Sequence, residues 1–174
     1  MANTTAIRFR EAQEDDAQAM LDYLRELTTE PDLPIVLSHE LALTFTLELE
    51  EKLVRQHRTQ SNAQWLLALD GGRIIGMVQL IGGTRAESAH CVRLGITVAK
   101  DWRDRGVGRE LMTRAIEWAR QAKGVSRVEL EVFSGNARAI HLYERMGFVA
   151  EGLRRRAFTK NGGEIDSLMM ALLL

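Results

Sequence analysis

The residues best suited to chemistry in this sequence form an arginine-rich loop with two glycines, between an expected strand and an expected helix. They are Arg103, Asp104, Arg105, Gly106, Val107, Gly108 and Arg109. The first amides of a helix have no partner within the helix and lie at the positive end of its dipole, so they bind anions. Glycine lacks a Cβ and lets a ligand approach the main chain closely. The loop therefore predicts a site for a phosphate-rich group such as a pyrophosphate.

A second stretch places a tyrosine two turns after a helix start. Asn136 is a good helix N-cap, and Gly147 is expected to end the helix. On a helical wheel Asn136 shares a face with Ala139, Ile140 and Tyr143. Two interpretations stay open for each of the two polar residues on this face. Asn136 either only caps the helix or also contacts a ligand. Tyr143 is either an aromatic residue of the core or a catalyst.

The hydrophobic pattern predicts the scaffold that must position these residues. Strands are expected at residues 7–11, 64–69, 73–81, 90–99, 127–133, 148–157 and 164–173, and helices from Asp15 or Asp16 to Thr28, at Leu41–Arg58, Val107–Ala122 and Asn136–Met146. Leu41–Arg58 is ambiguous because its first half alternates like a strand, and we interpret it as one helix. Gly76 is expected to mark a bulge. The order of elements predicts a mixed α/β fold in a single domain, residues 1–174, with one sheet and helices on both faces.

Composition argues against several classes of function. Lys and Arg number 23 against 24 Asp and Glu, so the net charge of −1 argues against nucleic acid or a membrane surface as a partner. The longest apolar run, Leu168–Leu174, is too short to span a bilayer. Cys91 is the only cysteine, which rules out an intrachain disulfide and favours a reducing, cytoplasmic location. The histidines lack zinc-ligand spacing, so no metal is expected.

The chain resembles the GCN5-related N-acetyltransferase (GNAT) family at two blocks. The first is the arginine-x-x-glycine-x-glycine signature of Arg103–Gly108, after a strand that ends at Val98, and the second is Asn136–Phe148. The opening Ile7–Ala12 and the tail around Gly163–Asp166 also match. The resemblance implies one domain with a mostly antiparallel mixed sheet of about seven strands that is splayed in the middle. It implies that acetyl-CoA lies in the gap between the strand before the glycine loop and the strand after its helix.

The same resemblance implies roles for individual residues. The implied contacts to acetyl-CoA are Ile96, Thr97 and Val98 for the pantetheine, the loop residues 103–109 for the pyrophosphate, and Asn136. Tyr143 is implied to act as general acid on the departing thiolate. A thiol pKa of roughly 8.5 against about 10 for a phenol makes that proton transfer reasonable. The backbone N–H of Ile96 or Val98 is our candidate donor to the developing oxyanion. The acetyl group would pass directly to an amine, without an acyl-enzyme.

No motif in the sequence identifies the general base or the acceptor. A lysine amine has a pKa of about 10.4 and needs a base to remove its proton. An α-amine has a pKa of about 8 and can lose its proton through a water relay. Candidate bases are Glu30, Glu87, His90, Glu129 and Glu131. A small amine or amino acid is the first expected acceptor and a protein N-terminus the second. The segments expected to select the acceptor are Pro31–Pro34, Leu41–Arg58 and Gly82–Ser88.

Other interpretations of the chain stay open beside the enzyme. A non-catalytic acyl-CoA sensor of the same fold is one, although Tyr143 and the intact loop favour catalysis. A nucleic-acid-binding protein is disfavoured by the near-neutral charge and by the lack of an aromatic stacking pattern. The apolar end Leu168–Leu174 is either a homodimer contact or a buried last strand. Arg154, Arg155 and Arg156 are interpreted as a charged, exposed strand edge.

Overall fold

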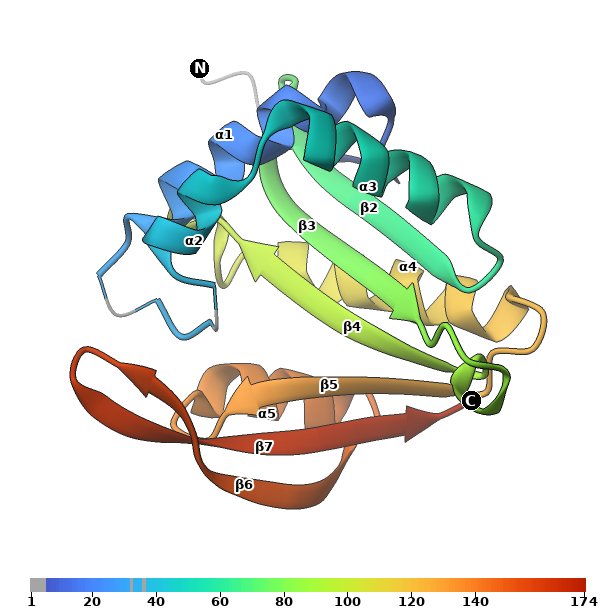
Figure 1. Ribbon diagram of the computed structural model, residues 1–174, viewed down its shortest axis with the longest axis vertical. Coiled ribbons are helices and arrows are strands. Elements are labelled where there is room, and N and C mark those ends of the chain that lie inside the picture. Colours follow the sequence, from blue (N-terminus) through green and yellow to red (C-terminus); the bar gives the residue numbers. More distant parts are fainter. Residues whose placement is uncertain (1–5, 32, 36) are drawn as a thin grey trace.

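Seven strands and five helices make up the described part of the chain. The computed structural model describes residues 6–31, 33–35 and 37–174. The strands are β1 (Arg8–Glu11), β2 (Ala63–Asp70), β3 (Arg73–Gly82), β4 (Cys91–Val98), β5 (Arg127–Phe133), β6 (Val149–Lys160) and β7 (Gly163–Leu173). The helices are α1 (Ala17–Thr28), α2 (His39–Thr44), α3 (Leu47–Thr59), α4 (Val107–Gln121) and α5 (Ala137–Arg145). The strands form one sheet in the order β1-β2-β3-β4-β5-β7-β6 (Figure 1).

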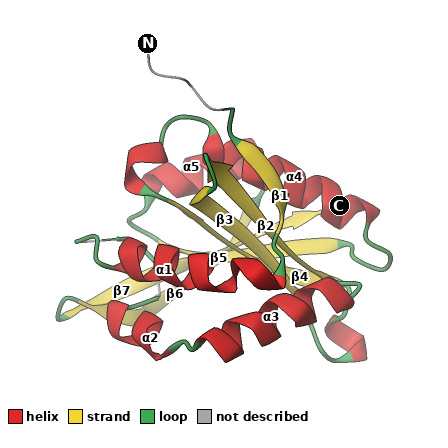
Figure 2. Cartoon of the chain, turned by 90° about the horizontal axis from the view of Figure 1, so that it is seen from above, coloured by secondary structure: helices red, strands yellow, loops and turns green. Residues whose placement is uncertain are grey.

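Helices cover both faces of this sheet, as the sequence predicts. α1 and α3 pack on one face of β2 and β3, and α4 packs on the opposite face of β2, β3 and β4 (Figures 1 and 2). α5 lies behind β5 and β7 in Figure 1. The core beneath α1 and α3 includes Met20, Val54 and Leu67, and the core beneath α4 includes Leu111 and Leu130. The core beneath α4 also includes Val107 and has Ala139 packed against it, so it holds the starts of α4 and α5, where both sequence blocks lie.

The sheet splits between β4 and β5. These two strands form the parallel pair of the sheet, and their pairing stops after Arg93↔Glu129, whereas the other neighbouring strands pair antiparallel. β4 continues along β3 as far as Gly76↔Val98, and β5 continues along β7 as far as Phe133↔Ser167. The two halves therefore diverge toward Val98 and Phe133. The mixed, mostly antiparallel and splayed sheet confirms the predicted fold class.

The prediction of one helix over Leu41–Arg58 is wrong. Two helices, α2 and α3, occupy this segment, because Phe45 adopts extended backbone (φ −73°, ψ 125°). The Thr46 hydroxyl then accepts the N–H of Leu49 at 3.2 Å and starts α3 as a new helix. The alternating leucines that favoured a strand are mostly exposed, so their pattern reflects no buried face.

Asp16 is the N-cap residue of α1, at one of the two predicted starts of the helix, but its carboxylate makes no capping hydrogen bond. Asp16 instead accepts the N–H of Gln13 at 2.8 Å and pairs with Arg10 at 2.5 Å, and this arginine lowers the pKa of Asp16. The short turn Glu14–Asp16 formed in this way leads directly into α1.

Gly76 lies beside the β3 bulge rather than at its extra residue. The register passes from Ala68↔Gly76 to Leu69↔Ile74, so the extra residue is Ile75. A Cβ at Gly76 would lie 3.1 Å from Leu111 Cδ1. Glycine is therefore needed here because α4 packs closely over β3.

The C-terminal hairpin is longer than predicted. β6 continues past Ala157 to Lys160, and its register with β7 shifts between Arg154 and Phe158. β6 is an edge strand of the sheet, at the end opposite β1. Arg154–Arg156 are exposed on it, which confirms the interpretation of these arginines as a charged strand edge.

Candidate active site

The edge of β4 presents main-chain groups to the gap. Cys91 C=O accepts the N–H of Gly83 at 3.1 Å, and Ala99 N–H donates to Ile75 C=O at 2.9 Å, so odd-numbered residues of β4 bond to β3. Because strand residues alternate, the N–H groups of Ile96 and Val98 face the side where β5 has diverged. Both residues are only half-buried, although their strand lies in the middle of the sheet. These amides are free to bind a ligand that enters the gap.

The start of α4 fits a diphosphate. Gly106 is the N-cap with φ +84°, a conformation that favours glycine, and it has no side chain to cap the helix. Glu110 N–H makes the first helical bond, to Gly106 C=O, so the preceding first-turn amides lack a helical partner. A Cβ at Gly106 would meet no atom of the described residues within 4 Å. The loop thus leaves open space in front of donors at the positive end of a 15-residue helix.

Gly108 is placed between the two sheet halves. A Cβ at this position would lie 3.6 Å from Val98 Cγ2 and 3.8 Å from Leu142 Cδ2. It would therefore fill part of the space between β4 and α5. Gly108 thus lies close to both β4 and α5, at the start of α4.

The charged loop residues differ in their partners. Arg103 pairs with Glu30 at 2.7 Å and donates from Nε to Val98 C=O at 3.0 Å. Asp104 pairs with Arg138 of α5 at 3.0 Å. The Arg105 guanidinium lies 5.3 Å from the centre of the Trp102 ring. Within the described residues Arg105 and Arg109 have no ion-pair partner, so theirs are the loop guanidinium groups best placed to reach a phosphate.

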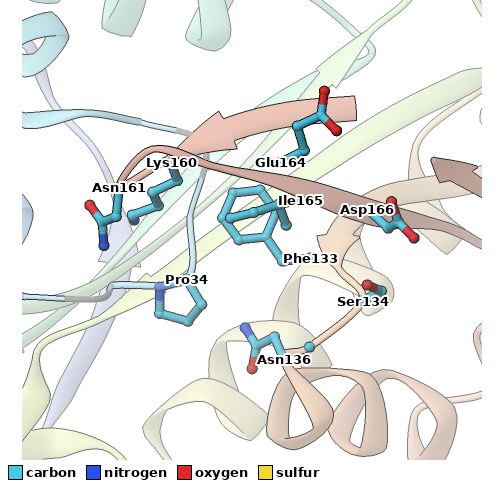
Figure 3. Close-up of a pocket in the computed structure, with 10 residues that line it drawn as sticks. Pro34, Phe133, Ser134, Asn136, Lys160, Asn161, Glu164, Ile165 and Asp166 are labelled. Atoms are coloured by element: carbon cyan, nitrogen blue, oxygen red, sulfur yellow. The ribbon is translucent and has the colours of Figure 1, made fainter. Parts of the chain in front are cut away.

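The two polar residues of α5 have different environments. Asn136 caps the helix, with its side-chain oxygen accepting the N–H of Ala139 at 3.2 Å. Its amide also lines a pocket (Figure 3). Tyr143 is 8% exposed and packs against Phe148, with 6.0 Å between ring centres. Burial raises the pKa of Tyr143 to about 12, so the phenol is protonated at neutral pH.

The pocket lies at the open end of the gap. Its volume is about 530 Å³, and its wall includes Phe133 at the end of β5, Asn136, Lys160 and Asp166 of the β6–β7 hairpin, and Pro34 (Figure 3). Pro34 belongs to the predicted acceptor segment Pro31–Pro34, of which residue 32 lies outside the described residues. The pocket therefore brings together the second sequence block and one of the predicted acceptor segments.

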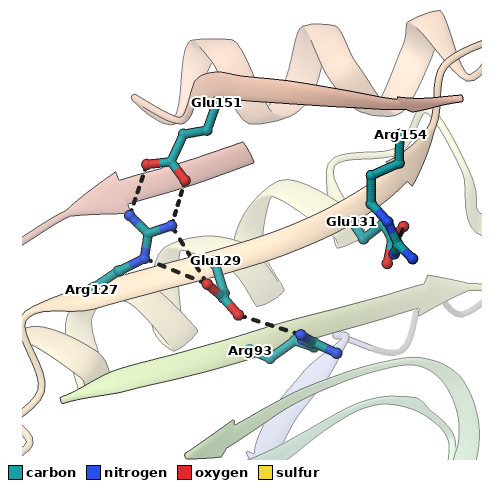
Figure 4. A network of polar contacts seen from close by, with 6 residues as sticks. All are labelled: Arg93, Arg127, Glu129, Glu131, Glu151 and Arg154. Atoms are coloured by element: carbon teal, nitrogen blue, oxygen red, sulfur yellow. Dashed lines mark hydrogen bonds and ion pairs between the residues drawn. The ribbon is translucent and has the colours of Figure 1, made fainter. Parts of the chain in front are cut away.

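Three of the predicted general-base candidates hold ion pairs. Glu30 binds Arg103, as above. Glu129 lies 3.5 Å from both Arg93 and Arg127, within a network on the face of β5 that α5 does not cover (Figure 4). Glu131 of the same face pairs with Arg154 at 2.6 Å and accepts the Ser167 hydroxyl at 2.5 Å. The oxygens of these three carboxylates are thus already engaged by arginine side chains.

The other two candidates lie at the wrong end of the gap. Glu87 and His90 are exposed and precede β4, whose first residues are paired with β5. The open end lies beyond Val98, at the other end of that strand. No predicted base is therefore both unpaired and close to the pocket.

Two site residues were missed by the sequence analysis. Tyr23 of α1 donates its hydroxyl to Thr97 Oγ1 at 3.2 Å, and burial raises the pKa of this tyrosine. Lys160 donates to the carbonyl of Leu33, across the pocket. Neither lies in a motif. The amphipathic pattern of α1 accounts for burial of Tyr23 but gives no signal of its polar partner.

The described residues show no metal centre and no membrane-spanning helix. No three His, Cys, Asp or Glu side chains among them are grouped to hold a metal ion. None of the described helices has the length and apolar character needed to cross a bilayer.

The sequence and the fold are both similar to those of known acetyltransferases. Residues 18–148 match the model described as "Acetyltransferase (GNAT) family". The chain belongs to the GNAT acetyltransferase family. A GNAT acetyltransferase from Streptococcus pneumoniae has a TM-score of 0.92 and 31% identity, with 97% of this chain and 99% of that chain covered. The yncA acetyltransferase of Salmonella typhimurium, solved with its cofactor acetyl-CoA, has a TM-score of 0.84 and 19% identity over 97% of this chain and 94% of that chain, which shows the shared GNAT fold.

Curated relatives in the GNAT family match shorter stretches. L-amino acid N-acetyltransferase AaaT of Escherichia coli is 35% identical over 61% of this chain and 65% of that protein. The ribosomal protein bS18-alanine N-acetyltransferase of Escherichia coli is 38% identical over 44% of this chain and 51% of that protein. The chain thus spans between half and two thirds of the length of these relatives.

Proposed function

We propose that the protein is an acetyl-CoA-dependent N-acetyltransferase that passes an acetyl group directly to a primary amine. The observation that carries this proposal is the gap between β4 and β5. Among the residues that the structure describes, its β4 edge has unpaired amides, and beside it α4 starts at a glycine loop without a side-chain cap. Family membership supports acetyl transfer as the reaction.

Backbone groups do most of the binding in this proposal. The first-turn amides after Gly106 hold the diphosphate, with Arg105 and Arg109 adding charge. The N–H groups of Ile96 and Val98 donate to the pantetheine and to the thioester oxygen, where negative charge develops during transfer. The Asn136 side chain, already fixed as a helix cap, contacts the pantetheine from α5.

Tyr143 is the catalytic residue in this proposal. Bound acetyl-CoA supplies the acetyl carbonyl and a sulfur leaving group. The amine lone pair forms the new C–N bond as the C–S bond breaks, and the phenol of Tyr143 donates its proton to the sulfur. The ammonium proton leaves to water, and solvent returns a proton to Tyr143. The raised pKa keeps the Tyr143 hydroxyl protonated at neutral pH, so its O–H is present to donate to the sulfur as negative charge develops there.

A small amine or amino acid is the first acceptor class we propose. The pocket volume of about 530 Å³ suits a small molecule, with Phe133 as an apolar wall and Asp166 as a carboxylate for the ammonium group. An α-amine also fits the finding that none of the predicted bases is both unpaired and near the pocket, since with a pKa near 8 it is neutral about a tenth of the time at pH 7. Similarity to an L-amino acid N-acetyltransferase supports the same class.

A protein N-terminus is the second acceptor class. It also presents an α-amine, and similarity to a ribosomal protein alanine N-acetyltransferase favours it. The two classes are separated by comparing the acetylation rate of a free amino acid with that of a short peptide that begins with the same residue.

The test is thiol release from acetyl-CoA with a panel of amines. The panel contains free L-amino acids, short peptides with free N-termini and diamines, and calorimetry measures acetyl-CoA binding in parallel. We expect release with at least one α-amine. Binding without release across the panel would instead favour the non-catalytic acyl-CoA sensor, and absence of binding would contradict both.

We also propose a single domain over residues 1–174, a cytoplasmic location and a homodimer. The cytoplasmic location is supported by Cys91 as the only cysteine. The homodimer is supported by exposed apolar side chains at Val149, Leu153 and Leu173 in the C-terminal strands. Sedimentation velocity of the wild-type chain and of a Val149→Glu variant tests the dimer. The added carboxylate should lower the fraction of dimer.

A further inference from the structure

The connection between α1 and α2 lies across the open end of the split sheet (Figure 1). Its described residues are 29–31, 33–35 and 37–38. On one side, Glu30 pairs with Arg103, which follows β4. On the other side, Lys160 at the end of β6 donates to the carbonyls of Leu33 and Ile35. Contacts from this one connection therefore reach both halves of the sheet.

The Glu30–Arg103 pair is built to hold its position. Its side chains are only 16% and 22% exposed, and one Arg103 nitrogen lies within 2.9 Å of both Glu30 oxygens. Arg103 is also fixed by its bond to Val98 C=O. Partial burial strengthens such a pair, whereas Glu26 of α1 and Arg73 form a pair that is about two-thirds exposed and contributes little.

The Lys160 contacts hold the other side. Leu33 is 6% exposed in the core beneath α1, so its carbonyl is a fixed acceptor. The Lys160 ammonium also lies 6.0 Å from the centre of the Phe133 ring. Pro34, Lys160 and Phe133 line the same pocket (Figure 3). The connection is therefore a wall of the pocket, and Lys160 fixes where that wall stands.

We propose that Glu30 and Lys160 are positioning residues for the acceptor, which together hold the α1–α2 connection as a wall of the acceptor pocket. Arg103, the first residue of the glycine-loop signature, serves this wall through Glu30, and its guanidinium is not a phosphate ligand. The inference rests on the proposed function, because it assigns the pocket to the amine. It assigns part of the selection of the acceptor to two contacts that hold the pocket wall.

Kinetics with the best amine of the panel test this assignment. Glu30→Gln and Lys160→Met should each raise the acceptor KM about tenfold, because a displaced wall misplaces the amine. The acetyl-CoA Kd should stay within about twofold, since backbone amides hold the diphosphate. The double variant should fall clearly short of the product of the two effects, because both contacts hold the same segment. Glu26→Gln and the exposed Lys123→Met are matched controls, for which the acceptor KM should not change.

Amide hydrogen exchange provides a readout that does not depend on acetyltransferase activity. Peptides covering residues 29–38 should exchange faster in Glu30→Gln and Lys160→Met than in the wild-type chain and the two controls. If exchange and acceptor KM both match the wild type, the proposal is overturned. It is also overturned if the acetyl-CoA Kd rises while the acceptor KM does not, because Arg103 would then serve the phosphate. A wild-type chain without any turnover contradicts the proposed function, and the exchange experiment still tests the wall.

Discussion

Glu50 should make the stability of the protein fall as pH rises. Its side chain is 1% exposed in α3, and its Oε1 has no hydrogen-bond partner among the described residues. Burial raises the pKa of Glu50 from 4.5 to about 7. A carboxyl whose folded pKa is raised contributes stability below its unfolded pKa, and this contribution is lost as pH rises through the folded pKa. The affected window therefore runs from about pH 4.5 to about pH 7.

The magnitude follows from the size of the pKa shift. A change from 4.5 to about 7 corresponds to about 3 kcal/mol across the full window, at 1.36 kcal/mol per unit. Most of this, about 2 kcal/mol, falls between pH 5 and pH 8. Glu50→Met keeps a side chain of similar length and removes the ionisation. Its advantage in unfolding free energy over the wild type should therefore grow by about 2 kcal/mol from pH 5 to pH 8.

Urea unfolding at the two pH values measures this difference. All other ionisable groups are shared by the two chains, so their contributions cancel. Glu48→Met, at an exposed position of the same helix, is the control and should show a difference that changes by less than about 0.5 kcal/mol. If the gap between Glu50→Met and wild type is the same at pH 5 and pH 8, Glu50 ionises as in water and the reasoning is refuted.

Three further substitutions test other parts of the structure. Tyr143→Phe should lower kcat by about 10- to 1,000-fold with little change in acetyl-CoA Kd, because only the proton donor is lost. Thr46→Ala removes the cap that accepts Leu49 N–H and should lower the unfolding free energy by about 1 kcal/mol in urea. Gly147→Ala should lower it by about 1–2 kcal/mol, because Gly147 has φ +93° and a Cβ would lie 3.3 Å from Leu172 Cδ1. Full activity in the first variant, or wild-type stability in either of the others, contradicts the respective argument.

The sequence predicted the parts of the fold whose local chemistry repeats. α4 and α5 have clear amphipathic faces, and glycines follow both helices. The glycine loop was readable because Gly106 and Gly108 stand directly before and within a helix start. The break at Phe45 was not readable, because exposed leucines on both sides give no buried stripe to show where one helix ends.

Contacts between distant segments explain most of what the sequence did not predict. Glu30 and Arg103 are 73 residues apart, and Lys160 and Leu33 are 127 residues apart. No local spacing signals such pairs. The same holds for Glu131, whose ion pair with Arg154 depends on the register of the C-terminal strands. Sequence alone therefore singled out the residues of the glycine loop but not which of its arginines are already paired.

Acetyl-CoA binding to two glycine variants tests the central claim most directly. Gly106 and Gly124 have nearly the same φ, +84° and +85°, and neither would place a Cβ within 4 Å of other described atoms. They lie beyond opposite ends of α4, so Gly106→Glu and Gly124→Glu carry the same strain and charge. Calorimetry should show wild-type affinity for Gly124→Glu and a loss of at least about tenfold for Gly106→Glu, whose carboxylate repels the diphosphate. Equal affinity in the two variants would contradict the placement of acetyl-CoA on this loop.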